Sequence, residues 1–220
     1  MRSLIVGGTS GLGLEIARLL HAGGDEVIIT GRKNPDVKGL QFQKFDLDLG
    51  GELASAVDTF VSALPKVDRF FYVAGFYQEG TITELEDQDI KNMLDVGINA
   101  PIWFVRELLQ NQHEIPQFVA VTSTSQWTPR EKEPIYTATK SALGMFANSL
   151  SLDSRVGKVL VAGPAGMNTP FWRMTGRDTS GDNDPVWVAK QVVEALNVDF
   201  NYAFVRILRN PPRTEVVETR

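Results

Sequence analysis

Three side chains have the types and spacing that carbonyl chemistry requires. Tyr136 and Lys140 are four positions apart, and Ser123 lies thirteen positions before the tyrosine. On a helix, residues four apart share one face, so the two heads can meet. A nearby ammonium stabilises a phenolate and lowers the tyrosine pKa from its usual value near 10. Ser123 would hydrogen-bond to a carbonyl oxygen while Tyr136 delivers a proton, which indicates general acid catalysis.

Each of these signals also has a plain structural explanation. A Y-x-x-x-K pair arises by chance on solvated helix faces, and Ser123-Thr124-Ser125 could simply begin the loop after a strand.

A glycine-rich turn near the N-terminus is the second signal. The run Gly7 to Gly13 follows a short apolar segment and opens a helical pattern, which is the context of a dinucleotide-binding turn. Glycines let backbone N–H groups approach a pyrophosphate, and the helix N-terminus favours its negative charge. The residues expected to hold the cofactor here are Gly7, Thr9, Ser10, Gly11, Leu12 and Gly13. Alone, such a turn is also compatible with an ordinary strand-to-helix connection.

The segment after the second expected strand indicates which cofactor binds. An acid there suits a ribose hydroxyl, whereas arginine suits a 2′-phosphate. The sequence reads Thr30-Gly31-Arg32-Lys33, so Arg32 and Lys33 favour NADP(H) over NAD(H). The alternative is an ordinary cationic loop.

Short β-rich runs alternate with longer helical patterns, which predicts an α/β fold with a parallel sheet covered on both faces. We expect about seven strands, at 3–6, 26–30, 42–46, 69–73, 117–122, 158–162 and 203–208. The expected helices begin after Ser10, ending near Gly23, and continue at 51–63, 87–111, 136–153 and 185–197. Ser123 then falls at a strand end, where open sheets place ligand-binding residues.

The residues after 168 form a polar stretch that contains large aromatic side chains. The range 169–184 is rich in Gly, Asp, Thr and Ser, yet it includes Phe171 and Trp172. It is interpreted either as a flap over a ligand or as a surface loop packed onto the core.

With these motifs in order, nearly the whole chain resembles the short-chain dehydrogenase/reductase family, whose fold is a Rossmann-type doubly wound sheet in a single domain, here 1–220. The family's glycine turn, its serine, its tyrosine and its lysine match the residues above, with the same thirteen-residue step. The resemblance implies further cofactor contacts at Asp46, Leu47, Ala74, Gly75, Pro164, Gly166, Met167 and Thr169, beside Tyr136 and Lys140 themselves.

One departure concerns the family's asparagine in the long fourth helix, which holds a kink and a water of the proton relay. Gly97 stands at that position, and Asn99 comes two residues later. Two residues turn a helix by about 200°, so Asn99 should point away unless the helix is distorted. Glycine allows the kink but offers no side chain to the water.

The resemblance implies an NADP(H)-dependent oxidoreductase that passes a hydride between the nicotinamide and a carbonyl or alcohol substrate. Ser123 would orient the oxygen, Tyr136 would protonate it, and Lys140 would bind the nicotinamide ribose. By the same analogy, homodimers or homotetramers would form through 93–109 and 136–152. Aromatic residues near the expected site mouth, among them Phe76, Tyr77 and Trp127, favour an apolar or aromatic carbonyl compound.

Composition limits the other functions. The net charge of −5 argues against a nucleic-acid binder, and no apolar run is long enough for a membrane span. His21 and His113 have no partner at ligand spacing, so no metal site is expected. The absence of cysteine and of a secretory signal is consistent with the cytoplasm.

Two alternatives stay open beside the enzyme. A non-catalytic NADP(H)-binding redox sensor or scaffold would explain Gly97 and the unusual Tyr72-Val73, although it has no need for the Ser-Tyr-Lys set. An extended sugar-nucleotide epimerase is disfavoured because the chain lacks room for a substrate domain.

Overall fold

The described part of the protein is built around one mostly parallel sheet. The computed structural model describes residues 1–47 and 51–220, without the side chains of residues 173 and 174. The strand order is β3-β2-β1-β4-β5-β6-β7-β8; β1 to β7 are parallel and β8 is antiparallel to β7. The predicted α/β doubly wound, Rossmann-type fold is confirmed.

The strands alternate with helices along the chain, as the sequence pattern predicts. The strands are β1 (Arg2–Val6), β2 (Glu26–Gly31), β3 (Leu40–Lys44), β4 (Arg69–Tyr72), β5 (Ile115–Val121), β6 (Val156–Pro164), β7 (Tyr202–Leu208) and β8 (Arg213–Thr219). The α-helices are α1 (Gly11–Ala22), α2 (Leu53–Ser62), α3 (Asp87–Leu94), α4 (Ala100–Gln112), α5 (Pro134–Leu150) and α6 (Pro185–Ala195). Three short helices complete the order: a π-helix η1 (Asp95–Asn99) and the 3₁₀ helices η2 (Thr124–Gln126) and η3 (Pro170–Thr175).

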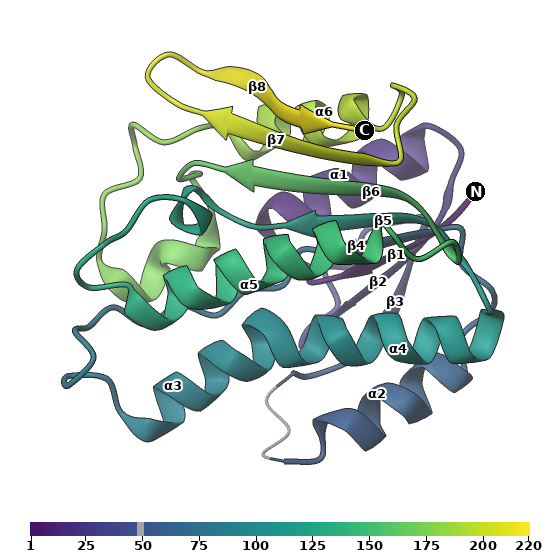
Figure 1. Cartoon of the computed structure of the whole chain (residues 1–220), viewed down its shortest axis with the longest axis horizontal. Helices are drawn as coiled ribbons and strands as arrows, with labels where there is room; N and C mark the ends of the chain where they lie inside the picture. The colour runs from purple at the N-terminus through teal and green to yellow at the C-terminus, as the bar shows by residue number, and fades with distance from the viewer. Residues whose placement is uncertain (48–50) are drawn as a thin grey trace.

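Helices cover both faces of the sheet (Figure 1). Helices α1 and α6 pack on one face, where the core includes Ile16 and Val192. Helices α2, α4 and α5 pack on the other, where it includes Phe104 and Leu143. Because the central strands are buried on both faces, they are continuous apolar runs, such as the fully buried Leu4 and Ile5 of β1.

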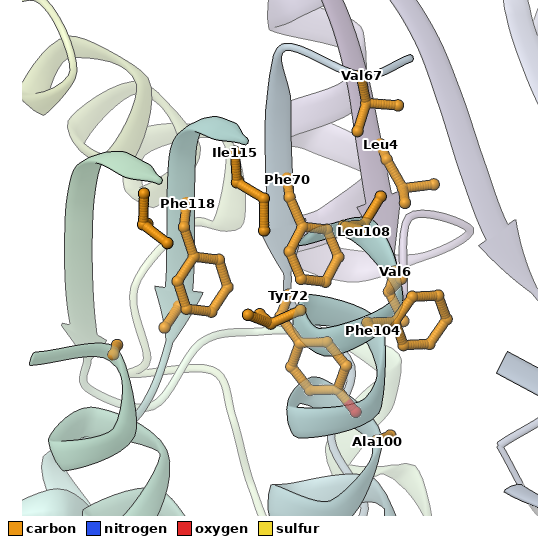
Figure 2. Packing of buried hydrophobic residues seen from close by; sticks show 14 of the residues in the cluster. Leu4, Val6, Val67, Phe70, Tyr72, Ala100, Phe104, Leu108, Ile115 and Phe118 are labelled. Carbon is orange, nitrogen blue, oxygen red and sulfur yellow. The ribbon is translucent and has the colours of Figure 1, made fainter. Parts of the chain in front are cut away.

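The core beneath α4 is rich in aromatic rings (Figure 2). Phe70 stacks on Phe118 with ring centroids 5.4 Å apart, and Phe104 of α4 packs against Phe70 at 5.8 Å. Tyr72 belongs to the same cluster and is fully buried. Burying a side chain of this size stabilises the fold by about 1.5–3 kcal/mol, so this cluster fixes α4 firmly over β4 and β5.

Two elements differ from the sequence prediction. Strand β8 was missed because it is an edge strand of mostly charged and polar residues, nearly all exposed, without the apolar run that marked the others. The single helix expected at 87–111 is interrupted by η1. No helix in the described ranges is long and apolar enough to span a bilayer.

Candidate active site

The three residues predicted to be catalytic meet at the C-terminal edge of the sheet. Ser123 follows β5 and caps η2, its Oγ accepting the backbone N–H of Ser125 at 3.2 Å. Tyr136 and Lys140 project from α5, and Ser123 lies close enough to the Tyr136 hydroxyl to lower its pKa by hydrogen bonding. The Lys140 Nζ lies 5.6 Å from the centre of the Tyr136 ring and donates to the Val121 carbonyl at 3.1 Å.

Burial dominates the ionisation of this group. It raises the pKa of Tyr136, while the hydrogen bond with Ser123 acts in the opposite direction. Burial also lowers the pKa of Lys140 to about 8. The four-residue spacing predicts that Lys140 lowers the pKa of Tyr136, but desolvation of the phenol outweighs such an effect in this structure. The tyrosine is therefore held in its protonated form.

A carboxylate that the sequence reasoning overlooked lies next to these residues. Glu133 is the N-cap residue of α5, and its Oε2 accepts the hydroxyl of Ser125 at 2.8 Å. Its Oε1 accepts the hydroxyl of Tyr77 at 3.4 Å, and Tyr77 packs edge-on against Tyr136 with centroids 5.1 Å apart. Its place three residues before Tyr136 was the available signal. Glu133 thus connects the serine loop to the aromatic side of the site.

The glycine turn leaves no room for side chains where the sequence predicted cofactor contacts. Gly7 has φ +86°, and a Cβ there would lie 2.6 Å from the Ala74 nitrogen. At Gly13 it would lie 2.1 Å from the Gly7 oxygen. The N-cap Ser10 makes no side-chain capping bond, and the first turn of α1 has no acidic residue. These features fit an anion at the start of α1.

Arg32 and Lys33, which were predicted to favour NADP(H) over NAD(H), lie beside the glycine turn. A Cβ on Gly31 would come within 2.3 Å of the Thr9 hydroxyl, so the end of β2 touches the glycine turn. Arg32 and Lys33 follow and are exposed. Asp46 and Leu47, just beyond β3, are partly buried, and Leu47 packs against the core.

The remaining predicted contacts lie on the loop after β6. Pro164 ends the strand and Met167 pairs with Asn183. Thr169 lies close to the glycine turn, because a Cβ on Gly11 would be 3.2 Å from the Cβ of Thr169. Gly166 lies beside an ion pair, described below. The structure therefore brings this loop against the N-terminus of α1.

An aromatic wall closes the site on the side of η3. A Cβ on Gly75 would lie 3.2 Å from the ring of Phe171 and 3.9 Å from the Lys140 Nζ. Phe171 packs on Trp172 with centroids 4.9 Å apart, and Tyr77 contacts both rings. Phe171, from the segment predicted to be a flap or a packed loop, therefore lies against Gly75, on the side of Lys140.

Gly97 and its surroundings explain how the long helix departs from the family pattern. Pro101 lacks the N–H that would bond to the Gly97 carbonyl in an α-helix, and the chain widens into η1, in which the Ala100 N–H bonds to the Asp95 carbonyl. Asn99 is exposed and bonds to Asp95 at 2.8 Å. It points away as expected, although the helix is distorted.

Two other residues complete this arrangement. In an α-helix the Ala100 N–H would bond to the Val96 carbonyl, but here it bonds to the Asp95 carbonyl. The Val96 carbonyl accepts a hydrogen bond from the Tyr72 hydroxyl instead, at 2.5 Å. Figure 2 shows that hydroxyl on the side of Ala100. A Cβ on Gly97 would lie 2.6 Å from the Cβ of Thr139, the residue before Lys140. Tyr72 and Gly97 are therefore parts of one local packing solution. Pro101 was the sequence signal that could have predicted it.

Comparisons with known proteins point to one family. The family described as short chain dehydrogenase matches residues 2–179. A 3-oxoacyl-[acyl-carrier-protein] reductase of Rickettsia felis is 27% identical over 158 residues, which are 69% of this chain and 65% of that enzyme. An uncharacterized oxidoreductase of Staphylococcus aureus is 24% identical and covers 88% of this chain and 90% of its own length.

The fold is also found among solved structures. A short-chain dehydrogenase from Sphingobium yanoikuyae, in complex with NADPH, superposes with a TM-score of 0.80 at 18% identity, covering 89% of this chain and 84% of that one.

Proposed function

This chain belongs to the short-chain dehydrogenase family, and we propose that it is an NADP(H)-dependent reductase or dehydrogenase acting on a carbonyl or alcohol group. The observation that carries the proposal is the convergence of Ser123, Tyr136 and Lys140 beside Gly75. The proposal treats residues 1–220 as one dinucleotide-binding and catalytic domain.

The glycine turn and its neighbours would hold the cofactor. The backbone of Gly7 to Gly13 suits the pyrophosphate, because Cβ atoms at Gly7 and Gly13 would fill the cradle. Arg32 and Lys33, which are both exposed, would bind the 2′-phosphate. The other proposed contacts are Asp46, Leu47, Ala74, Gly75, Pro164, Gly166, Met167 and Thr169. The NADPH bound to the similar Sphingobium protein supports this choice.

The residues of the chain divide the chemistry between them. When bound, NADPH supplies the hydride that a carbonyl carbon accepts. Tyr136 gives its hydroxyl proton to the carbonyl oxygen as the C=O bond becomes a C–O single bond; burial keeps that proton in place until then. Ser123 donates a hydrogen bond that orients the same oxygen. Lys140 places a positive charge near the Tyr136 ring. General acid catalysis of this kind contributes about 10²–10⁴-fold to the rate.

Replacing the acid tests the proposal. Tyr136→Phe should lower carbonyl reduction by about 10²–10⁴-fold and leave the dissociation constant of NADPH nearly unchanged, since only the hydroxyl is removed. Tyr202→Phe, on β7 at the far side of the sheet, is the matched control and should keep wild-type rates. An undiminished rate in Tyr136→Phe would refute the assignment.

A second candidate function is a non-catalytic NADP(H)-binding sensor. Gly97 favours it, because Thr139 fills the space in which the family's asparagine would stand. Tight NADPH binding without turnover over a broad panel of aliphatic, aromatic and sugar-like carbonyls would decide for the sensor.

Association of copies through α4 and α5 is part of the same proposal. Met145 of α5 is 65% exposed, which leaves apolar surface on that helix for a second copy. Sedimentation of the wild type beside Met145→Glu would test this, since a buried charge at the contact should dissociate the oligomer.

A further inference from the structure

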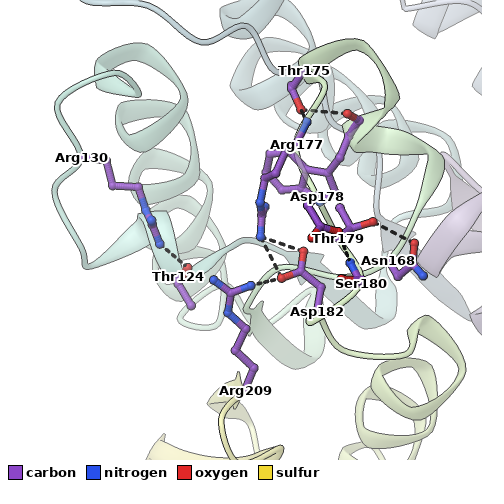
Figure 3. Close-up of polar contacts among 11 residues, drawn as sticks. Thr124, Arg130, Asn168, Thr175, Arg177, Asp178, Thr179, Ser180, Asp182 and Arg209 are labelled. Atoms are coloured by element: carbon purple, nitrogen blue, oxygen red, sulfur yellow. Dashed lines mark hydrogen bonds and ion pairs between the residues drawn. The ribbon is translucent and has the colours of Figure 1, made fainter.

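Three arginines from three separate segments gather near the active site. Arg130 follows η2, Arg177 follows η3, and Arg209 follows β7. Figure 3 shows the Arg209 guanidinium between Asp182 on one side and the Thr124–Arg130 pair on the other. Burial lowers the pKa of Arg209 most, and the positive charges of Arg177 and Arg130 lower it further. The other two arginines therefore lie within electrostatic range of Arg209.

One buried carboxylate serves two of these cations. The Arg177 Nη2 donates to both oxygens of Asp182, at 2.8 and 2.7 Å, and Arg209 pairs with the same side chain. The side chain of Asp182 is only 1% exposed, whereas those of Arg177 and Arg209 are 32% and 38% exposed. A single carboxylate balances one of the two charges, so a positive charge remains on the solvent side.

The third arginine connects this cluster to the reacting groups. Arg130 donates to the Thr124 hydroxyl at 3.1 Å and pairs with Glu133 at 3.5 Å. Thr124 follows Ser123 directly, and the charge of Arg130 acts on Tyr136. Arg177 lies 4.4 Å above the ring of Trp172, in the aromatic wall.

The guanidinium groups keep donors for a ligand. A guanidinium has five N–H groups in a planar fork. Within the described residues, no protein acceptor is present for the Nε or Nη1 of Arg177, the Nε or Nη2 of Arg209, or the Nη1 of Arg130. Among nearby acids, Asp178 is exposed and caps the Ser180 nitrogen. Planar forks of this kind match carboxylate and phosphate oxygens.

The cluster is separate from the predicted 2′-phosphate contacts. Arg32 lies after β2, while Arg177 and Arg209 lie after β6 and β7, and Arg130 lies after β5 and η2. Strands β1, β4 and β5 lie between β2 and β6, which is about 19 Å at the usual strand spacing. Gly166 lies directly against the ion pair, since a Cβ there would be 2.6 Å from the Arg177 Nη2.

We propose that Arg130, Arg177 and Arg209 bind an anionic group, a carboxylate or a phosphate, at the end of the substrate remote from the reacting carbonyl. The role as a substrate subsite rests on the proposed reductase function. The aromatic wall beside Arg177 would contact the apolar body of such a molecule. The expected substrate is thus an oxo acid or an oxo phosphate, which replaces the neutral carbonyl compound that the sequence favoured.

Matched pairs of substrates test the anion requirement. Aliphatic oxo acids of increasing length are compared with their methyl esters, and dihydroxyacetone phosphate with dihydroxyacetone, by following NADPH oxidation. The first pairs test a carboxylate and the last tests a phosphate. We expect kcat/KM to be higher for the anion by about 10- to 100-fold in at least one series.

The variants separate binding from folding. Arg130→Gln and Arg209→Gln should lower kcat/KM for the anion far more than for its neutral partner and so remove the preference for the anion. Arg130→Lys should restore part of that preference. Arg155→Gln, which removes an exposed arginine paired with Asp153, is the control and should keep the preference. Since Arg209→Gln also breaks the pair with Asp182, Arg130→Gln decides the outcome where that variant unfolds.

A binding measurement is independent of turnover. Quenching of tryptophan fluorescence by an oxo acid should report binding near Trp172 in the wild type and in Tyr136→Phe, and should weaken in Arg130→Gln. Binding that depends on the arginines without any turnover supports the anion site and refutes the reductase. If wild-type kcat/KM is equal for the acid and its ester, or if Arg130→Gln lowers kcat/KM equally for both, the anion site is refuted while the reductase function stands.

Discussion

Substitution of Gly97 by alanine should weaken both the fold and the site. The new Cβ would lie 2.6 Å from the Cβ of Thr139, 2.8 Å from its Oγ1 and 3.0 Å from its Cγ2. Carbon atoms prefer separations of about 3.5–4.0 Å, so η1 and α5 must move apart by about 1 Å. Rotation of the Thr139 side chain cannot relieve the contact with Cβ, which is fixed to the backbone.

The magnitude follows from two opposing effects. Overpacking a core costs about 1–3 kcal/mol, and alanine recovers about 0.5–1 kcal/mol over glycine inside a helix. We therefore expect Gly97→Ala to lower the free energy of unfolding by about 1–2 kcal/mol. Because Lys140 follows Thr139, a displacement of about 1 Å should also lower kcat by about 10- to 100-fold.

Urea unfolding followed by circular dichroism, and steady-state reduction of a carbonyl substrate, measure the two effects. Gly51→Ala is the matched control, because a Cβ at Gly51 would meet no atom of the described residues within 4 Å; the stability of this variant should change by less than about 0.5 kcal/mol. Thr139→Ala in the Gly97→Ala background should recover only part of the loss, because the Cβ contact persists. Wild-type stability and activity in Gly97→Ala would refute the packing of η1 on α5.

Three further outcomes are expected. Tyr72→Phe leaves the partly buried Val96 carbonyl without its donor and should lower the free energy of unfolding by about 1–3 kcal/mol, measured in urea; an unchanged midpoint would contradict the hydrogen bond. Arg32→Ala should raise the dissociation constant of NADPH far more than that of NADH, by fluorescence titration, and equal weakening would mean that Arg32 does not contact the phosphate. Burial lowers the pKa of Lys140 in the folded protein to about 8, below its usual value of 10.5. The unfolded chain therefore binds more protons between these values, and stability should rise with pH from about 8 to 10. That slope, at most about 1.4 kcal/mol per pH unit, should vanish in Lys140→Met, and persistence of the slope in urea titrations would refute its origin.

Local sequence rules were sufficient where one element determines the outcome. The glycine turn, the alternation of strands and helices, and the spacing of Ser123, Tyr136 and Lys140 all depend on residues close in the chain. The fold and the meeting of these three residues could therefore be predicted.

Features that depend on contacts between distant segments could not be predicted from the sequence. Tyr72 and Val96 come from β4 and η1, and no local pattern shows that one would bond to the other. Asp182 and Arg209 meet only because the chain returns through β7. The direction in which the pKa of Tyr136 shifts also depends on burial by several elements, which the spacing of residues does not reveal. Pro101, and Glu133 three residues before Tyr136, were local signals that were missed.

The most direct test of the central claim follows the hydride and the proton donor together. NADPH that carries deuterium at the transferred position is incubated with the preferred carbonyl substrate, and the product alcohol is analysed by mass spectrometry. Each alcohol molecule formed by the wild type should carry one deuterium, and Tyr136→Phe should form it about 10²–10⁴-fold more slowly at unchanged NADPH affinity. Labelled alcohol formed at the wild-type rate by Tyr136→Phe would contradict this prediction, as would tight NADPH binding by the wild type with no labelled product from any substrate.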